Sequence, residues 1–304
     1  MKFTKQNLIY STSRAQVPVV DVMNDKWRIY FSDRNEHGYS VPHYIDVEPG
    51  NPDKIITVKS KQLLETGPLG SFDYAGVMPT SVITTPGSDR GRYMYYIGWT
   101  NRKDVPYHNT IGLSISHDEG DSWSKLYKGP IFGTSRHEPG YTGTICVMPG
   151  DTEWQAWYLS CREWVKINNR IEPKYTINYA VSLNGIDWIP RGIAIDLEND
   201  EGGISQASVI QDNDKYIMYF SVRDTSNYRK GGPGAYRIEY AESSDGEVWE
   251  RKGVCLERSK TGWDSEMVSY PNVLDYQNQR YIFYNGNNFG QTGIGYAIMP
   301  LQNG

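Results

Sequence analysis

Several features that would point to a compartment or a cofactor are scarce in this sequence. Only three cysteines occur in 304 residues, Cys146, Cys161 and Cys255, and they have no metal-binding spacing. An odd number of widely separated cysteines favours reduced core thiols over a disulfide framework or a zinc site. The five histidines also lack a recognisable ligand pattern. We therefore expect neither a metal nor a cofactor.

Long apolar runs are missing as well. Residues 1–10 lack the apolar core of a signal peptide, and no stretch is long and apolar enough to span a membrane. The net charge is −5 and the basic residues are scattered, which argues against a nucleic-acid partner. These absences predict a soluble cytoplasmic protein with no membrane or nucleic-acid partner, and they leave its oligomeric state open.

Aromatic and turn-forming residues are abundant. Aromatic side chains make up 13% of the chain, with 24 Tyr and 9 Trp, beside 30 Gly and 16 Pro. No run of apolar residues follows helical spacing. This composition favours many short strands joined by tight turns, so we expect an all-β fold.

One aromatic string recurs along the chain. Tyr30-Phe31-Ser32-Asp33-Arg34 is repeated, with changes, as residues 158–162 and 219–223, while residues 96–100 and 284–288 are copies without the arginine. An apolar triplet lies upstream of each copy, centred on Val19, Val82, Ile145, Val209 and Val273, at intervals of 63 or 64 residues. This regularity in an all-β chain indicates propeller blades.

The repeat predicts one five-bladed β-propeller domain over residues 1–304, with four antiparallel strands per blade. The blades would cover about residues 14–70, 71–135, 136–201, 202–262 and 263–304, the last completed by residues 1–10. Residues 3–10 resemble the fourth strand of blade four, so we expect the N-terminal strand to close the ring and leave no long sheet edge exposed.

Turns marked by Asp or Asn and by Gly separate the third and fourth strands of three blades. Each is followed by a tryptophan, Trp123, Trp188 or Trp249, that can fill the gap between neighbouring blades. The first copy, residues 116–123, resembles the Asp-box of sialidases. We interpret these turns as structural.

Polar residues collect in the loops that enter the first strands, which surround the axis of a propeller. Acidic side chains there include Asp73, Glu138, Asp264 and Glu266. Convergent carboxylates at a pocket mouth suit glycosidic cleavage, where one protonates the leaving oxygen and another attacks or activates water. Alternatively, some of them bind strand amides or sugar hydroxyls. Arg14, Gln16, Gln206 and Tyr270 belong to the same loops.

The loops after the second strands carry cations and aromatics on the same side. Arg34, Arg162 and Arg223 occupy equivalent repeat positions and could hold a carboxylate or phosphate, or pair with neighbouring acids. Trp99 could stack on a sugar face, and His37 and Asn285 could bind hydroxyls. The expected partner is a small sugar or oligosaccharide with an anionic group.

With these residues in view, the chain resembles the five-bladed propeller glycosidases of glycoside hydrolase families 43, 32 and 68, and the related family 130 phosphorylases. Asp73 in Phe-Asp-x-x-Gly-Val-x-Pro, and residues 263–267 with 284–287, look like a glycosidase-related bacterial group. The resemblance implies an acid at Glu138 and a partner acid at Asp73. The first-blade acid of those families is missing, because Arg14 and Gln16 occupy its place, and Glu266 or Asp264 could replace it.

We therefore expect a carbohydrate-active enzyme that cleaves or transfers a glycosyl group of an acidic or phosphorylated sugar. Asp73, Glu138 and Glu266 are the candidate catalytic residues. Two alternatives stay open: a glycosyltransferase or sugar-nucleotide processing enzyme of polysaccharide assembly, and a non-catalytic glycan-binding propeller.

Overall fold

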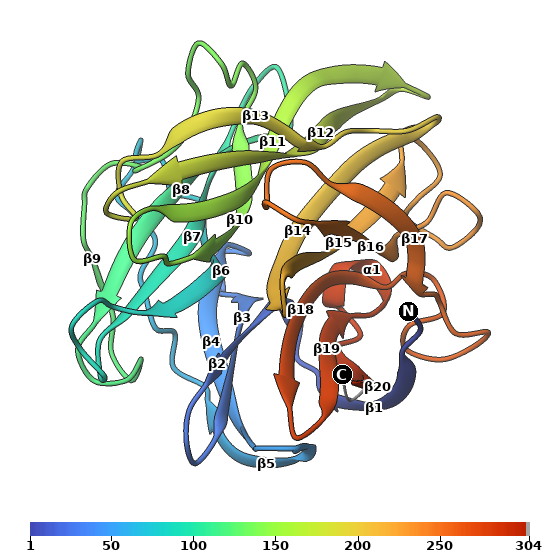
Figure 1. Ribbon diagram of the computed structural model, residues 1–304. Helices are drawn as coiled ribbons and strands as arrows, with labels where there is room; N and C mark the ends of the chain where they lie inside the picture. The colour runs from blue at the N-terminus through green and yellow to red at the C-terminus, as the bar shows by residue number, and fades with distance from the viewer. Residues whose placement is uncertain (302–304) are drawn as a thin grey trace.

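The structure, a computed structural model, describes residues 1–301. Within them it contains twenty strands and one four-residue helix, α1 (Asn287–Gly290), so the predicted all-β fold is confirmed. Figure 1 shows the sheets arranged around a common centre. No helix in this range is long and apolar enough to cross a bilayer.

The strands form three sheets. The smallest has the order β1 (Thr4–Tyr10), β20 (Ile294–Pro300), β19 (Gln279–Asn285), β18 (Ser269–Tyr276). The second has the order β2 (Gln16–Val22), β3 (Trp27–Arg34), β4 (Ser40–Glu48), β6 (Gly76–Thr84), β7 (Arg92–Asn101), β8 (Tyr107–Ser116), β9 (Ser124–Lys125), and β5 (Asn51–Lys59) pairs with β4. The third has the order β10 (Thr142–Met148), β11 (Trp154–Ile167), β12 (Arg170–Ser182), β14 (Glu201–Asp212), β15 (Lys215–Asp224), β16 (Arg237–Ser243), β17 (Glu250–Leu256), and β13 (Ile189–Ile195) pairs with β12.

Each of the two larger sheets consists of two antiparallel units joined by one parallel pair of residues, Ser40 with Gly76 and Tyr175 with Gly203. Glycine suits both junctions, because a Cβ atom on Gly203 would collide with the Tyr175 ring at 2.3 Å and one on Gly76 would lie only 3.0 Å from Ser40 Cβ. We number the units in chain order: unit 1 is β2–β5, unit 2 is β6–β9, unit 3 is β10–β13, unit 4 is β14–β17, and unit 5 is β18–β20 with β1.

The first strands of the units, β2, β6, β10, β14 and β18, lie nearest the middle of the molecule (Figure 1). They contain the recurring apolar triplets. The polar residue that opens a triplet accepts a hydrogen bond from a backbone N–H of the next unit, and so links neighbouring first strands. The four links are Ser81 with Val147, Thr144 with Gln206, Ser208 with Val273, and Asn272 with Val20. In unit 1 the equivalent residue is Pro18, which has no acceptor side chain, and a buried ion pair between Asp21 and Arg92 joins units 1 and 2 instead.

The tryptophans that follow the three Gly-containing turns, Trp123, Trp188 and Trp249, pack against the preceding unit. Trp123 lies 5.9 Å from Tyr30, and Trp249 lies 5.9 Å from Trp157, measured between ring centroids. In the third copy Trp188 lies 6.4 Å from Tyr95. These contacts agree with the interpretation of the turns as structural.

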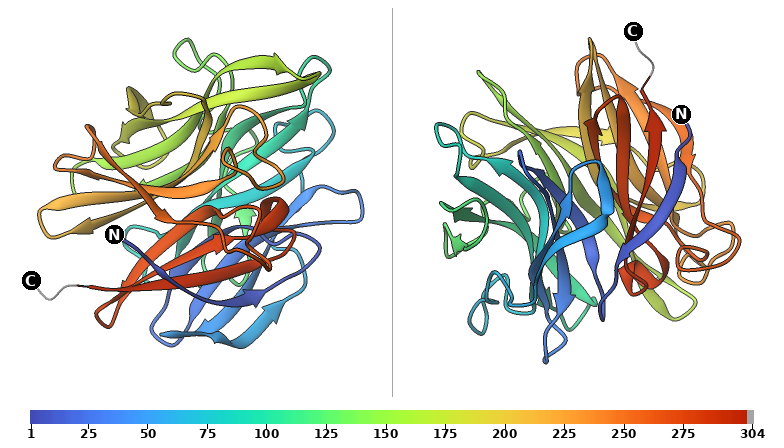
Figure 2. Two further views of the ribbon diagram at one scale, coloured as in Figure 1. Left: turned by 90° about the vertical axis from the view of Figure 1, so that its right-hand side faces the viewer. Right: turned by 90° about the horizontal axis from the view of Figure 1, so that it is seen from below.

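The two ends of the described chain meet in unit 5. Strand β1 pairs antiparallel with β20, with Thr4 opposite Ile298 and Leu8 opposite Gly295. Figure 2 shows the N-terminal strand beside the C-terminal strands in both views. The pairing of the first strand with the last unit therefore follows the prediction from sequence, while the five-blade count and ring closure stay predictions.

Candidate functional site

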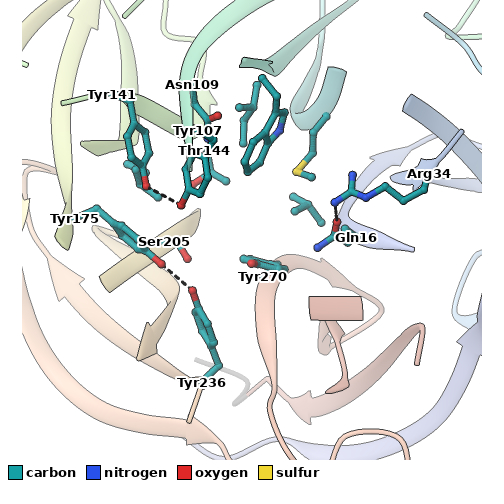
Figure 3. Close-up of a pocket in the computed structure, with 16 residues that line it drawn as sticks. Gln16, Arg34, Tyr107, Asn109, Tyr141, Thr144, Tyr175, Ser205, Tyr236 and Tyr270 are labelled. Atoms are coloured by element: carbon teal, nitrogen blue, oxygen red, sulfur yellow. Dashed lines mark hydrogen bonds between the residues drawn. The ribbon is translucent and has the colours of Figure 1, made fainter. Parts of the chain in front are cut away.

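A small cavity of about 110 Å³ lies where the first strands come together (Figure 3). Aromatic side chains dominate its wall, and Arg34 is the one residue with a full charge in its lining. The lining residues are Gln16, Val17, Arg34, Met78, Ile97, Trp99, Tyr107, Asn109, Tyr141, Gly143, Thr144, Leu159, Tyr175, Ser205, Tyr236 and Tyr270. We call this space the central cavity.

All five first strands have an irregularity in their pairing next to the central cavity. In three of them a residue other than glycine has a left-handed backbone: Val17 (φ 55°), Gln206 (φ 52°) and Tyr270 (φ 58°). Such a conformation costs about 1–3 kcal/mol and persists where surrounding contacts enforce it. Here the amide of Val17 donates to Asn285 Oδ1 at 2.7 Å, and that of Tyr270 donates to Ser221 Oγ at 2.7 Å. Bulges and enforced strain are concentrated at functional sites.

The tyrosines of the central cavity form two hydrogen-bonded pairs. The hydroxyls of Tyr107 and Tyr141 are 3.3 Å apart, and those of Tyr175 and Tyr236 are 2.7 Å apart. Burial raises the pKa of Tyr107, Tyr141, Tyr236 and Tyr270. These four side chains are therefore neutral hydroxyls at neutral pH.

Three polar atoms of the cavity wall have no hydrogen-bond partner among the described residues: Trp99 Nε1, Asn109 Oδ1 and Ser205 Oγ. Asn109 and Ser205 are each 3% exposed. Leaving a buried polar atom unpaired costs about 1–3 kcal/mol, so each of these atoms calls for a partner such as a bound water or a ligand. The wall thus offers one donor, one acceptor and one hydroxyl.

Arg34 reaches the opposite side of the central cavity from Tyr175 and Tyr236 (Figure 3). Its Nη2 donates to Gln16 Oε1 at 2.7 Å, and no carboxylate of the described chain lies within 4.0 Å of its nitrogens. Burial, followed by the nearby charge of Arg14, lowers the pKa of Arg34 to about 10. The neighbouring carboxylate of Asp33 offsets part of this lowering of the pKa of Arg34, but it accepts its hydrogen bonds from Ser13 and from the backbone amides of Arg14 and Arg34. The guanidinium remains charged at neutral pH and keeps donors available.

The predicted acids Asp73 and Asp264 do not line the central cavity. Asp73 is 2% exposed and binds Lys125 Nζ at 2.5 Å and Tyr96 Oη at 3.2 Å. Asp264 repeats this arrangement with Lys5 at 2.5 Å and Tyr284 at 3.0 Å. In both cases the carboxylate joins an outer-strand lysine to a second-strand tyrosine.

Glu138 occupies the equivalent position in unit 3 and is also buried. It accepts hydrogen bonds from Tyr158 Oη at 2.5 Å, from Asn178 Nδ2 at 3.3 Å and from the Ser160 hydroxyl. It lies outside the cavity lining as well. Glu266 is exposed and contributes to a separate groove of about 1000 Å³ with Arg170, Arg229 and Lys230. The structure therefore does not bring Asp73, Glu138 and Glu266 together around one guest.

The predicted binding residues divide into two groups. Gln16, Arg34, Trp99 and Tyr270 line the central cavity. The others do not: Arg14 and Arg162 lie on or near the surface, His37 is exposed beside Glu36, Gln206 donates to Thr80 O, and both amide atoms of Asn285 bind backbone groups.

Arg223 was expected to contact the ligand, but its side chain is fully buried. Its nitrogens donate to Tyr175 Oη at 3.0 Å, to Pro173 O at 2.6 Å and to Asp224 O at 2.9 Å. The guanidinium also lies 4.8 Å from the centroid of the Tyr175 ring. It supports the cavity wall from behind and does not reach the cavity itself.

The sequence analysis did not choose six of the lining residues as site residues: Tyr107, Asn109, Tyr141, Tyr175, Ser205 and Tyr236. Tyr107, Tyr175 and Tyr236 stand in or just before the third strands of units 2, 3 and 4. A tyrosine that recurs in or just before the third strand was the sequence pattern that could have predicted these lining residues. Among residues 1–301, no three or more His, Cys, Asp or Glu side chains gather as a metal site would require.

Comparisons with known proteins give relatives in sequence and in fold. The chain is 30% identical over 297 residues to two proteins of Mycobacterium tuberculosis, Uncharacterized protein MT1551 and Uncharacterized protein Rv1502, covering 96% of this chain and 94% of each of them. A comparison with known protein families found no match.

Solved structures of similar fold are glycoside hydrolases. A thermostable family-43 glycoside hydrolase superposes with a TM-score of 0.70 at 15% identity, covering 99% of this chain and 94% of that one. The catalytic domain of a Coprinopsis cinerea GH62 alpha-L-arabinofuranosidase gives 0.66 at 10% identity, covering 98% and 96%. A further structure, named simply as a glycoside hydrolase, gives 0.74 at 17% identity, covering 99% and 93%. At these identities the likeness shows the fold alone, which is that of the propeller glycoside hydrolases.

Proposed function

Because this chain belongs to one family with the two mycobacterial proteins and has the fold of propeller glycoside hydrolases, we propose that it recognises a sugar that carries an anionic group. The guest is a single sugar residue seated in the central cavity. The five units are the blades of a closed ring, and the ring gives this cavity its walls.

The links between units support the ring. Polar side chains of the first strands join units 2 to 3, 3 to 4, 4 to 5 and 5 to 1, while a buried ion pair joins units 1 and 2. The pairing of β1 with β20 supplies the fourth strand of unit 5. Every unit then has a neighbour on both sides, as a five-bladed propeller requires.

The surroundings of Arg34 are the main support for an anionic group on the bound sugar. A guanidinium in a confined aromatic cavity, bonded to one neutral amide and to no carboxylate, is suited to a forked contact with a carboxylate or phosphate. The unpartnered atoms of Trp99, Asn109 and Ser205 match the mixed donor and acceptor character of sugar hydroxyls. The faces of Trp99 and the tyrosines supply the apolar contact that sugar rings make.

The central cavity does not support the usual chemistry of two carboxylates, because none is present in its lining. Glycosidases of that kind need a carboxylic acid and a carboxylate on either side of the scissile bond. Asp73 and Glu138, the expected pair, are each held by a tyrosine hydroxyl inside their own unit. Recognition of an acidic sugar is therefore the function that the geometry supports best.

A thermal-shift series tests the proposal. Uronic acids, ulosonic acids and sugar phosphates are compared with neutral sugars of the same stereochemistry. A ligand that binds only the folded state raises the melting temperature, and at 100 times its Kd it adds about 2.7 kcal/mol of stability. We expect at least one acidic sugar to raise the melting temperature and its neutral counterpart to have little effect.

Arg34→Ala should abolish that shift. Arg162→Ala is the matched control, because Arg162 holds the same repeat position but is exposed to solvent. Arg34→Ala with the shift intact, or no response to any acidic sugar, would refute the proposal.

A further inference from the structure

Tyr175 differs from the other tyrosines of the central cavity in having a cation behind it. Its hydroxyl oxygen receives a hydrogen bond from Arg223 Nε at 3.0 Å and lies 2.7 Å from the hydroxyl of Tyr236. The ring is 5% exposed and packs on Gly203, where any Cβ atom would collide with it. Figure 3 places the hydroxyls of Tyr175, Tyr236 and Ser205 on one side of the cavity.

Arg223 is a fully buried cation without an anionic partner in direct contact. No carboxylate of the described chain lies within 4.0 Å of its nitrogens, and two of its three hydrogen bonds go to backbone carbonyls. The third goes to Tyr175, so this phenol is the one acidic group that hydrogen-bonds to it. The faces of Tyr175 and Tyr228, at 4.8 and 4.2 Å, offset part of the cost of burying the charge.

The charges around this pair come from several elements. Glu172 on β12 is engaged by Arg229 at 2.6 Å and by Tyr228 at 2.7 Å, so its charge is already matched. Burial disfavours the charged form of Arg223, but Tyr175 first, then Tyr236 and Tyr228, hold the pKa of Arg223 above its ordinary value. The guanidinium is thus permanently charged, and its field acts on Tyr175 Oη.

A fixed positive charge beside an oxygen stabilises negative charge that develops on that oxygen in a transition state. Among the described residues, no cation donates a hydrogen bond to the hydroxyl of Tyr107 or Tyr141, which bond to each other. The adjacent Ser205 Oγ has no partner among the described residues and can bind a sugar hydroxyl beside Tyr175. In a cavity without a carboxylate, Tyr175 is the nucleophile best prepared by its surroundings.

We propose that Tyr175 is a catalytic residue that attacks the anomeric carbon of the sugar bound in the central cavity. This inference rests on the proposed recognition of an acidic sugar. A bond forms between Tyr175 Oη and the anomeric carbon as the bond from that carbon to the leaving oxygen breaks. The electron pair of the broken bond stays on the leaving oxygen, which takes the phenolic proton of Tyr175. The products are a tyrosyl glycoside and an alcohol, and attack by water then reverses the roles and restores the phenol.

A covalent trap tests this step directly. The full-length protein is incubated with a fluorinated glycosyl fluoride of the acidic sugar that gives the largest thermal shift. Fluoride is a good leaving group, and the second fluorine, beside the anomeric carbon, slows hydrolysis of the adduct. We expect about one equivalent of fluoride released per protein, a mass increase of one glycosyl residue, and peptide mapping of that residue to Tyr175.

Two variants accompany the wild-type protein. Tyr175→Phe should bind the parent sugar, measured by calorimetry, but should form no adduct. Tyr216→Phe, which removes a tyrosine hydroxyl outside the central cavity and without contact to Arg223, should still form the adduct. The wild-type mapping decides the matter even where a variant fails to fold.

The outcomes separate the two proposals. Sugar binding without an adduct, or with an adduct on a residue other than Tyr175, would overturn the nucleophile assignment and leave recognition standing. Absence of binding by every acidic sugar would overturn both.

Discussion

Loss of the buried ion pair between Lys5 and Asp264 should destabilise the protein by about 3 kcal/mol. Lys5 lies on β1, and its Nζ is 2.5 Å from Asp264 Oδ2 and 3.0 Å from Ser259 Oγ. Removing one partner of a buried pair costs about 3–5 kcal/mol because the other charge is left buried. The lysine side chain is 24% exposed, while the aspartate is 3% exposed, so we take the lower end of that range.

The substitution to make is Lys5→Met, which keeps the length of the side chain and removes its charge. Unfolding entropy near the melting point is about 2.1 cal/mol/K per residue, which for 304 residues gives about 0.6 kcal/mol/K. A loss of about 3 kcal/mol therefore lowers the melting temperature by about 5 °C. The assay is thermal denaturation followed by circular dichroism at constant pH.

Two controls make the measurement specific. Lys2→Met changes an exposed lysine close by in sequence and should leave the melting temperature almost unchanged. In the double variant Lys5→Met/Asp264→Asn no charge is left unpaired, so its loss of stability should be smaller than the sum of the two single losses by about 1 kcal/mol or more. A melting temperature for Lys5→Met within about 1 °C of the wild type would refute the reasoning.

Three further predictions concern other parts of the molecule. Deletion of residues 1–10 removes β1 from β20 and should lower the melting temperature more than Lys5→Met does, so equal melting of truncated and full-length protein would contradict ring closure. Glu138→Gln should cost about 1–3 kcal/mol of stability in urea denaturation, because buried hydroxyls lose a charged acceptor; a changed affinity for the acidic sugar with unchanged stability would argue against the structural role. Burial raises the pKa of Asp118, but hydrogen bonds from Ser122 and Ser116 outweigh it and hold that pKa at about 2, below the ordinary 3.8. The stabilisation is present at neutral pH and lost as the pH falls from about 4 to about 2, so Asp118→Asn should lower the melting temperature at pH 7 and have little effect near pH 2, and a deficit independent of pH would disprove this account.

The sequence was sufficient for the strands and turns because those signals are local and repeated. The apolar triplets and the Tyr-rich strings gave the first and second strands of every unit, and Trp123 and Trp249 pack where the turn pattern placed them. Even the pairing of β1 with β20 followed from a resemblance between two short segments. In these cases one periodic pattern specifies both the element and its neighbour.

The repeat pattern could not predict whether a polar side chain points into the cavity, to the surface or into the interior. Arg34, Arg162 and Arg223 share a repeat position, but they lie in a cavity, at the surface and in the interior respectively. A register shift between Cys161 and Glu163 changes the alternation of β11 at Arg162. A shift of one residue moves a side chain to the other face of a strand, and the sequence carries no mark of it.

Lysine partners on distant strands explain why the predicted acids Asp73 and Asp264 do not line the central cavity. Asp73 is neutralised by Lys125 and Asp264 by Lys5, each from an outer strand far away in sequence. Without those partners in view, a loop aspartate at the entrance of a first strand is indistinguishable from a catalytic one.

Within residues 1–301, the side-chain hydrogen bonds that link neighbouring first strands are missing at one junction, between units 1 and 2, because Pro18 has no acceptor side chain. The ion pair of Asp21 with Arg92 holds these two units together without such a link. Gln16 and Arg34 stand on one side of this seam and Trp99 on the other. The backbone pair of Ser40 with Gly76 and the ion pair of Arg28 with Asp121, at 2.8 Å, also cross this junction, so in the proposed ring sheet pairing and charged contacts replace the missing side-chain link.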